Sequence, residues 1–130
     1  MANAMTRAGL ETRACLRKLL DGLREFATSR NDVIIVRVMS RWISVKSRSG
    51  GRVFAELRPG KEKIEVFILP PPRELGFNRL ISMAPSSQGW GWFKSKFVVD
   101  ENGGATTALR LLRISYFSSF GRGKPPSRRR

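Results

Sequence analysis

The 130-residue sequence contains no histidine, a single cysteine and only 10 acidic residues. Without histidine, the chain lacks the side chain that most often serves as general base, proton shuttle or metal ligand. Cys15 alone cannot form an intrachain disulfide or a thiolate zinc site, and it has no imidazole to activate its thiol. We therefore expect Cys15 to be a small buried residue, in a protein that needs no cofactor and is not an enzyme.

Long apolar runs are also absent. No run approaches the roughly 18 to 20 residues that a membrane-spanning helix requires, and Met1–Thr6 lacks the apolar core of a secretory signal. Hydrophobic residues nevertheless make up 41% of the chain, too many for a wholly disordered protein. These features predict a soluble cytoplasmic protein with no membrane partner.

The shortage of acids leaves a large positive charge. Against the 10 Asp and Glu residues stand 25 Lys and Arg, so the formal net charge is +15, with a pI near 11.6. Such a chain attracts polyanions. Residues 121–130 carry five of the basic residues and no acid, so the charge excess is expected on the folded part as well as on the tail. The alternative is a basic surface that serves only solubility.

The clearest structural pattern is a predicted β-hairpin over Val53–Leu69, where apolar and polar residues alternate with the two-residue period of a strand. Pro59 and Gly60 suit a type II turn or a four-residue loop, because proline presets one backbone angle and glycine tolerates a positive φ at the next residue. Either closure places Ala55 opposite Ile64 on the apolar face.

Helical periodicity marks the two ends of the chain, and further strand patterns surround the hairpin. The predicted helices are Leu10–Thr28 and Ala105–Ser119, and the further strands are Val33–Met39, Arg41–Ser47, Arg79–Met83 and Trp90–Val99. The pattern does not decide whether Arg41–Ser47 continues the strand before it or follows through a bulge near Ser40.

The fold class is therefore α+β, with an antiparallel sheet of about four to six strands flanked by an N-terminal and a C-terminal helix. Residues 10–120 are expected to form a single domain, after a flexible N-terminus of residues 1–9. The tail, residues 121–130, combines like charges with glycine and proline and should be disordered when free.

Acidic residues give little support for catalysis. Glu56 and Glu65 are the only acids on adjacent predicted strands, near Lys63, and no Asp or Glu has a lysine two residues later, as in many metal-dependent nucleases. A salt-bridged strand exterior is the favoured interpretation of this pair. A hydrolase or nuclease is kept as a third hypothesis.

Binding chemistry is better represented, because aromatic residues stand among basic ones. Trp42, Trp90, Trp92 and Phe93 could stack on bases, at about 1–3 kcal/mol per base, while nearby cations meet phosphates. The alternative is that at least two of these rings belong to the core. Trp90, flanked by glycines, is the better candidate for exposure. The predicted nucleic-acid-binding residues are Arg41, Lys46, Arg58, Lys61, Lys63, Trp90, Lys94, Lys96, Arg122, Lys124, Arg128, Arg129 and Arg130.

Within the tail, Arg122-Gly123-Lys124-Pro125 resembles the core of an AT-hook. In that motif an extended Arg-Gly-Arg-Pro segment lies in the narrow minor groove of A·T-rich DNA, and here Lys124 stands at the second arginine. A tail that only aids solubility is the alternative.

Four segments carry a family resemblance: Gly51–Ala55 opening the hairpin, Pro70–Pro72 ending it, Gly89–Phe93 entering a strand, and Leu111–Tyr116 in the last helix. In their order they resemble the small MmcQ/YjbR-like domains and a related uncharacterised bacterial domain labelled a predicted transport protein. The resemblance implies an α+β fold with a double-wing character, a suspected DNA-binding role and no catalytic residue.

The leading hypothesis from sequence is thus a non-enzymatic domain that binds nucleic acid, duplex DNA in preference to RNA, through a basic strand-and-loop face and the cationic tail. The alternative is an interaction domain for an acidic protein partner or a small anionic ligand.

Overall fold

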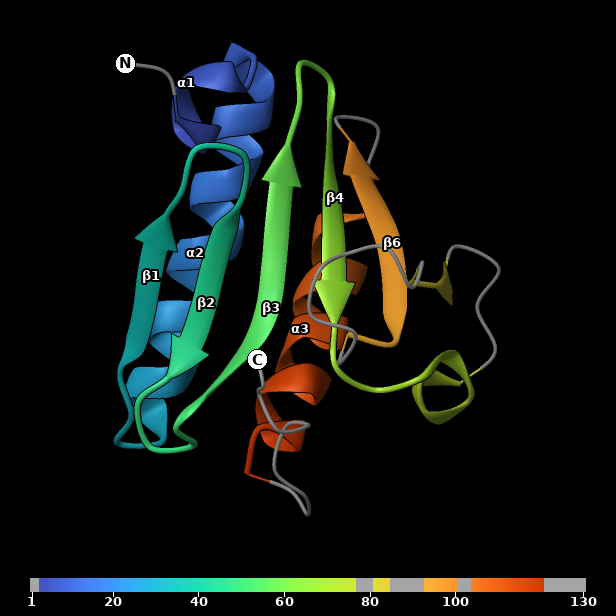
Figure 1. Ribbon diagram of the computed structural model, residues 1–130. Helices are drawn as coiled ribbons and strands as arrows, with labels where there is room; N and C mark the ends of the chain where they lie inside the picture. Colours follow the sequence, from blue (N-terminus) through green and yellow to red (C-terminus); the bar gives the residue numbers. More distant parts are fainter. Residues whose placement is uncertain (1–2, 77–80, 85–92, 101–103, 121–130) are drawn as a thin grey trace.

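The computed structural model of the chain describes residues 3–76, 81–84, 93–100 and 104–120 (Figure 1). Two helices come first, α1 (Ala4–Arg7) and α2 (Leu10–Ser29), and one comes last, α3 (Ala105–Ser118). The strands between them are β1 (Ile34–Val38), β2 (Ile43–Ser47), β3 (Arg52–Pro59), β4 (Lys63–Ile68), β5 (Ser82–Met83) and β6 (Ser95–Asp100), with a short 3-10 helix, η1 (Pro72–Leu75), after β4.

The strands form one six-stranded antiparallel sheet in the order β1-β2-β3-β4-β6-β5. The predicted α+β fold with a terminal helix at each end is therefore confirmed. The predicted spans of α2 and α3 each differ from the observed ones by one residue. The segment before Leu10, for which no element is predicted, contains α1, and Ala4 within it is fully buried. None of the described helices has the length and apolar character that crossing a membrane would require.

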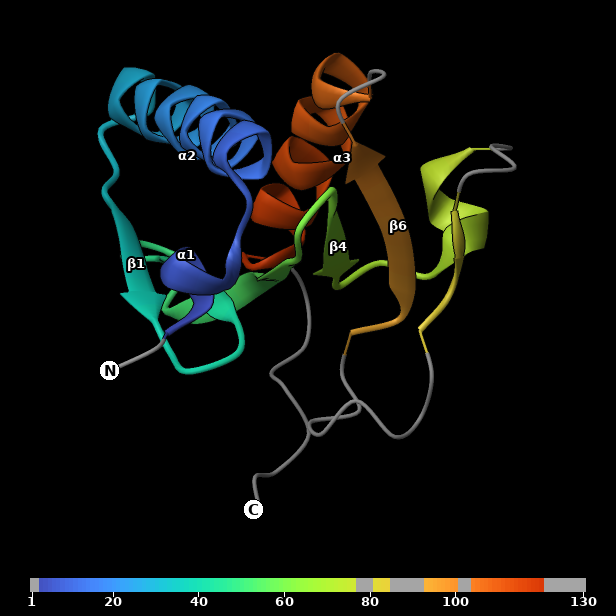
Figure 2. The ribbon, with the colours of Figure 1, turned by 90° about the horizontal axis from the view of Figure 1, so that it is seen from above.

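Both long helices lie on the same side of the sheet, as the view from above shows (Figure 2). Between them and the sheet lies one hydrophobic core, in which each fully buried aliphatic side chain contributes about 1.5–3 kcal/mol. Its members include Leu16, Leu19 and Leu23 of α2, Ala108 and Leu112 of α3, and Ile43, Val45, Leu57, Ile64 and Val66 of the sheet. We call the opposite side of the sheet, which no described helix covers, the open face.

The first two strands form a tight hairpin of their own. β1 and β2 are antiparallel neighbours, and the Met39 N–H donates to the Trp42 carbonyl at 2.8 Å across the turn. The predicted segment Arg41–Ser47 thus neither continues the preceding strand nor follows it through a bulge. Apolar alternation gives the same pattern for a long strand and for two short ones, so only the turn distinguishes them.

The central hairpin forms as predicted, but its predicted register is wrong. Ala55 pairs with Ile68 instead of Ile64, Pro59 belongs to β3, and the turn closes where the Gly60 N–H donates to the Lys63 carbonyl at 2.8 Å. Because the shift is an even number of residues, every side chain keeps its face, so the apolar pattern fits both registers.

Contacts with the N-terminal helices hold this turn in place. The Thr12 hydroxyl donates to the Lys61 carbonyl at 2.9 Å, and the Gly9 N–H donates to the Gly60 carbonyl at 3.3 Å. A Cβ atom at residue 9 would lie 2.3 Å from the Lys61 carbonyl oxygen, so only glycine permits this approach. The register is therefore fixed by α2, not by the turn residues alone.

A β-bulge in β3 changes which residues reach the open face. Val45 pairs with Ala55, but Lys46 pairs with Val53, so Phe54 is an extra residue in β3. Phe54 is fully buried, and its carbonyl accepts a hydrogen bond from the Ser115 hydroxyl of α3 at 2.6 Å. The same hydroxyl accepts from the Leu69 N–H at 3.0 Å. Ser115 thus stabilises the bulge from inside the core.

The end of α2 positions Asp32, a buried acid. The Asp32 N–H donates to the Ala27 carbonyl at 2.9 Å and the Asn31 N–H to the Thr28 carbonyl at 3.0 Å, while Asn31 takes a left-handed φ of 59°. These bonds form a Schellman motif, in which asparagine is one of the few non-glycine residues that fit. The chain consequently leaves the helix with Asp32 pointing into the core.

Four hydrogen bonds converge on the Asp32 carboxylate. Their donors are the Val33 and Ser49 N–H groups (2.7 and 2.9 Å) and the Ser47 and Tyr116 hydroxyls (2.5 and 2.7 Å). Burial alone would raise the pKa of the Asp32 carboxyl, but these four bonds outweigh it and hold the pKa well below its usual range. The carboxylate therefore ties α3 to the segment before β1, the end of β2 and the turn that follows β2.

We expect Tyr116→Phe to lower the free energy of unfolding by about 1–3 kcal/mol, because it removes one buried donor and leaves an Asp32 oxygen short of a partner. Urea unfolding measures the change. Ser118→Ala, which deletes a hydroxyl from the outer side of the same helix, should change stability by less than about 0.5 kcal/mol. Equal effects of the two substitutions would contradict a special role for the Asp32 network.

Stability should also fall steeply in acid. Because the folded-state pKa of Asp32 lies below the value of about 3.9 for an unfolded chain, the unfolded state binds a proton first as the pH drops. The contribution of Asp32 is thus complete above about pH 4 and is lost progressively below it. Urea midpoints measured from pH 7 to pH 2 should fall more for the wild type than for Asp32→Asn, and parallel curves would contradict the assignment.

Candidate nucleic-acid interface

One row of paired residues crosses the open face from edge to edge. Successive Cα partners in this row are Arg37 of β1, Ser44 of β2, Glu56 of β3, Phe67 of β4, Lys96 of β6 and Ser82 of β5. Cross-strand partners share a face of a sheet, so all six side chains project away from the helices. The row combines cations, an aromatic ring and one acid.

Phe67 lies at the centre of the open face beneath two cations. The Arg58 guanidinium carbon is 4.9 Å from the centroid of the Phe67 ring, and the Lys96 Nζ is 5.9 Å from it. Both lie within the range of a cation–π interaction. Phe67 is only 2% exposed, so it serves as a floor for the cations and not as a free stacking surface.

The same two cations form the ion pairs of the open face. Arg58 Nε lies 2.6 Å from Glu56 Oε2, and Lys96 Nζ lies 2.9 Å from Glu65 Oε2. The salt-bridged strand exterior expected for the two acids is therefore present, although their partners are Arg58 and Lys96 instead of Lys63. Burial raises the pKa of the Glu56 carboxyl, and the hydrogen bond and charge of Arg58 only partly offset this effect.

Three further cations project from the open face without an ion pair to any described residue: Arg37, Lys46 and Lys63. The five basic side chains share this face with three acids, of which Glu56 and Glu65 are already paired and Asp100 is the Cα partner of Lys63. On the helix side, α2 and α3 together carry six basic residues and three acids. Positive charge therefore exceeds negative charge on both sides of the sheet, and the open face is distinguished by the cations that lie over an aromatic ring.

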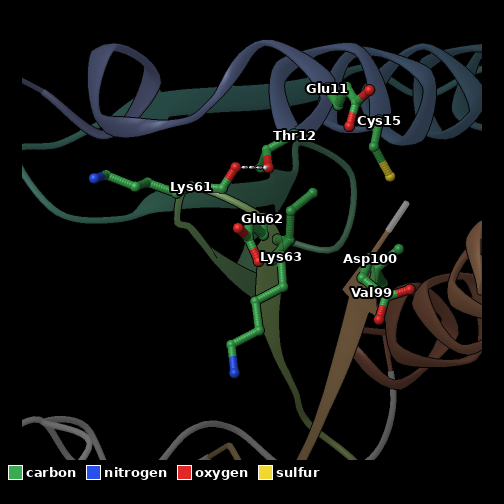
Figure 3. Close-up of a pocket in the computed structure, with 9 residues that line it drawn as sticks. Glu11, Thr12, Cys15, Lys61, Glu62, Lys63, Val99 and Asp100 are labelled. Carbon is green, nitrogen blue, oxygen red and sulfur yellow. Dashed lines mark hydrogen bonds between the residues drawn. The ribbon is translucent and has the colours of Figure 1, made fainter. Parts of the chain in front are cut away.

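The turn of the central hairpin borders a cavity of about 180 Å³, which contains no comparable charge excess (Figure 3). Its lining includes the acids Glu11, Glu62 and Asp100, together with Cys15 of α2, whose thiol pKa is raised chiefly by burial. Among the described residues, no cluster of His, Cys, Asp or Glu is arranged to hold a metal ion.

The two lysines of this turn extend away from each other (Figure 3). Lys61 is exposed in the turn and Lys63 is exposed at the start of β4. They do not converge on one anion. The hairpin tip is therefore a weaker candidate for phosphate binding than the centre of the sheet.

The structure brings together only part of the predicted site. Lys46, Arg58, Lys63 and Lys96 share the open face, as the strand period and pairing require. Arg41 is exposed between β1 and β2, and Lys94 is exposed just before β6. Six predicted residues lie outside the described part of the chain: Trp90, Arg122, Lys124, Arg128, Arg129 and Arg130.

The sequence did not predict Arg37, Phe67 or Glu56 as residues of the candidate nucleic-acid interface. Arg37 alternates with apolar residues in its strand, which marks it as outward, but the sequence does not say which strand lies beside it. Phe93, named above as a ring that could stack on bases or belong to the core, is buried and lines a cavity with Trp42 and Glu56. Of the predicted strand Trp90–Val99, residues 90–92 lie outside the described part of the chain, and β6 begins at Ser95.

Comparison of this chain with known protein families, with curated proteins and with solved structures finds no match. The geometry of the open face is therefore the basis on which a function can be argued.

Proposed function

We propose that this protein binds nucleic acid through the open face of its sheet and does not catalyse a reaction. The observation that carries the proposal is the pair Arg58 and Lys96 over Phe67, with Arg37, Lys46 and Lys63 elsewhere on the same face and outside the ion pairs of the described residues. Cations on this face suit phosphates, and Phe67 supports two of them from beneath. The resemblance to MmcQ/YjbR-like domains agrees with this proposal.

Two parts of the sequence-based hypothesis belong to the proposal. The cationic tail, residues 121–130, would add phosphate contacts to those of the open face. The cytoplasm is the proposed location, because both nucleic acid and a reduced Cys15 are found there.

We expect Arg37→Gln/Lys46→Gln/Lys63→Gln to weaken oligonucleotide binding and its salt dependence, without disturbing the two ion pairs. Removing one phosphate contact should lower the slope of log affinity against log salt by roughly 0.9 on duplex DNA and 0.7 on a single strand. Fluorescence anisotropy with labelled duplex and single-stranded oligonucleotides, at salt concentrations between about 50 and 200 mM, measures the slope.

The matched control removes the same charge from the helix side, with Arg17→Gln/Lys18→Gln/Arg110→Gln, all exposed residues. If the binding site lies on the open face, this control should change the slope of log affinity against log salt less than the open-face variant does. Equal changes would mean that binding is only diffuse charge attraction. If polyglutamate binds as tightly as nucleic acid, the result favours an acidic protein as the partner instead of nucleic acid.

Removal of residues 121–130 tests the tail. If its five cations contact phosphates, the salt slope on duplex DNA should fall by several units, at roughly 0.9 for each contact. The shortened chain should retain its far-ultraviolet circular dichroism spectrum. An unchanged slope would show that the tail serves solubility alone.

A further inference from the structure

A cavity of about 290 Å³ opens on the open face beside the stacked cations. It is lined by Arg37, Met39, Trp42, Ser44, Val53, Glu56 and Phe93. Ligand sites usually measure about 300–1,000 Å³, so this cavity suits one small ring system. Its walls are largely apolar, and they include the half-buried Trp42, whose ring centroid lies 5.8 Å from the Arg58 guanidinium carbon.

The bulge in β3 accounts for the cavity. In a regular strand, Val53 and Glu56 would point to opposite faces. The extra residue Phe54 places both on the open face, separated by two residues that point into the core. A gap is left between the side chains of Val53 and Glu56 on the open face. In other sheets, bulges often lie beside binding sites and redirect side chains toward them.

Glu56 supplies the only carboxylate among the described residues that line the cavity. Its side chain is 3% exposed, and Arg58 Nε is the single described donor to it, at 2.6 Å from Oε2. The other oxygen, Oε1, accepts no hydrogen bond from the described residues. Because a carboxylate oxygen accepts strong hydrogen bonds from N–H donors, a ligand that presents them is favoured here.

We propose that this cavity receives one unpaired base of a single-stranded nucleic acid, guanine in preference to the others, with its ring against Trp42 and its N–H edge at Glu56. The inference rests on the proposed function and specifies its substrate. A base within a duplex has its edge occupied by the partner strand, so only an unpaired base can enter in this way.

The hydrogen-bonding edges of the bases explain the preference. Guanine presents two adjacent donors, N1–H and the 2-amino group, which match a carboxylate. Adenine and cytosine each present one amino group beside an acceptor. Thymine and uracil place a single N–H between two carbonyl oxygens, which would face the Glu56 carboxylate unfavourably. Arg37 in the cavity wall and the exposed Arg41 next to Trp42 are placed to meet the flanking phosphates.

The test compares labelled nine-nucleotide strands that differ only at the central base, using the full-length wild-type chain. The strand with one guanine among thymines should bind roughly 5- to 100-fold more tightly than the all-thymine strand. Hypoxanthine, which lacks the 2-amino group, should give an intermediate affinity, and N1-methylguanine should lose the advantage. Equal affinity for all four strands overturns the inference but leaves the proposed function intact, whereas no binding of any strand or duplex overturns both.

A matched pair of substitutions tests the carboxylate. Glu56→Gln should reduce the guanine-to-thymine affinity ratio at least several-fold while changing affinity for the all-thymine strand little. Glu65→Gln removes the same charge from the same face but does not line the cavity, so it should preserve the ratio. A wild-type ratio in Glu56→Gln, or an equal loss in both variants, overturns the role of Glu56. If Glu56→Gln fails to fold by circular dichroism, the series of modified bases decides the question on the wild-type chain.

Discussion

The carboxylate of Asp32 is the interaction on which the rest of the structure depends. It is buried, and its four donors come from the beginning of β1, the end of β2, the following turn and α3. A buried charge is tolerated only when hydrogen bonds satisfy it, so these segments must meet at one point or the carboxylate becomes costly. The Schellman motif at the end of α2 delivers Asp32 to that point.

Adjacent residues of α3 connect this network to the open face. Tyr116 donates to Asp32, and Ser115, one residue earlier, holds the carbonyl of Phe54 at the β3 bulge. The bulge in turn places Val53 and Glu56 around a cavity on the far side of the sheet. Packing inside the core therefore shapes a candidate binding surface on the other side of the sheet.

The two faces of the sheet follow different chemistry. On the inner face, aliphatic residues exclude water and supply most of the stabilisation. On the open face, Phe67 is covered by Arg58 and Lys96, whose long side chains shield the ring while their charged ends remain near solvent. The open face can thus present positive charge to a polyanion and still bury an aromatic ring.

Much of the candidate site followed from the sequence, but its arrangement did not. The strand period alone marks Lys46, Arg58 and Lys96 as outward-facing. It does not show that Phe67 lies beneath Arg58 and Lys96, because that depends on which strands are neighbours. The shared position of Val53 and Glu56 was also hidden, since a bulge is a departure from the period and leaves no mark on it.

The sequence by itself determined the spans of α2 and α3, the central hairpin and the inward or outward direction of most strand residues. These properties are local, because helix and strand periods are read over a few adjacent side chains. Tertiary structure alone decided the register of β3 and β4, the pairing of β1 with β2, the bulge at Phe54 and the partners of Asp32. An even shift of register preserves every face, and Asp32 and Tyr116 are 84 residues apart, so only packing of the whole chain selects these arrangements.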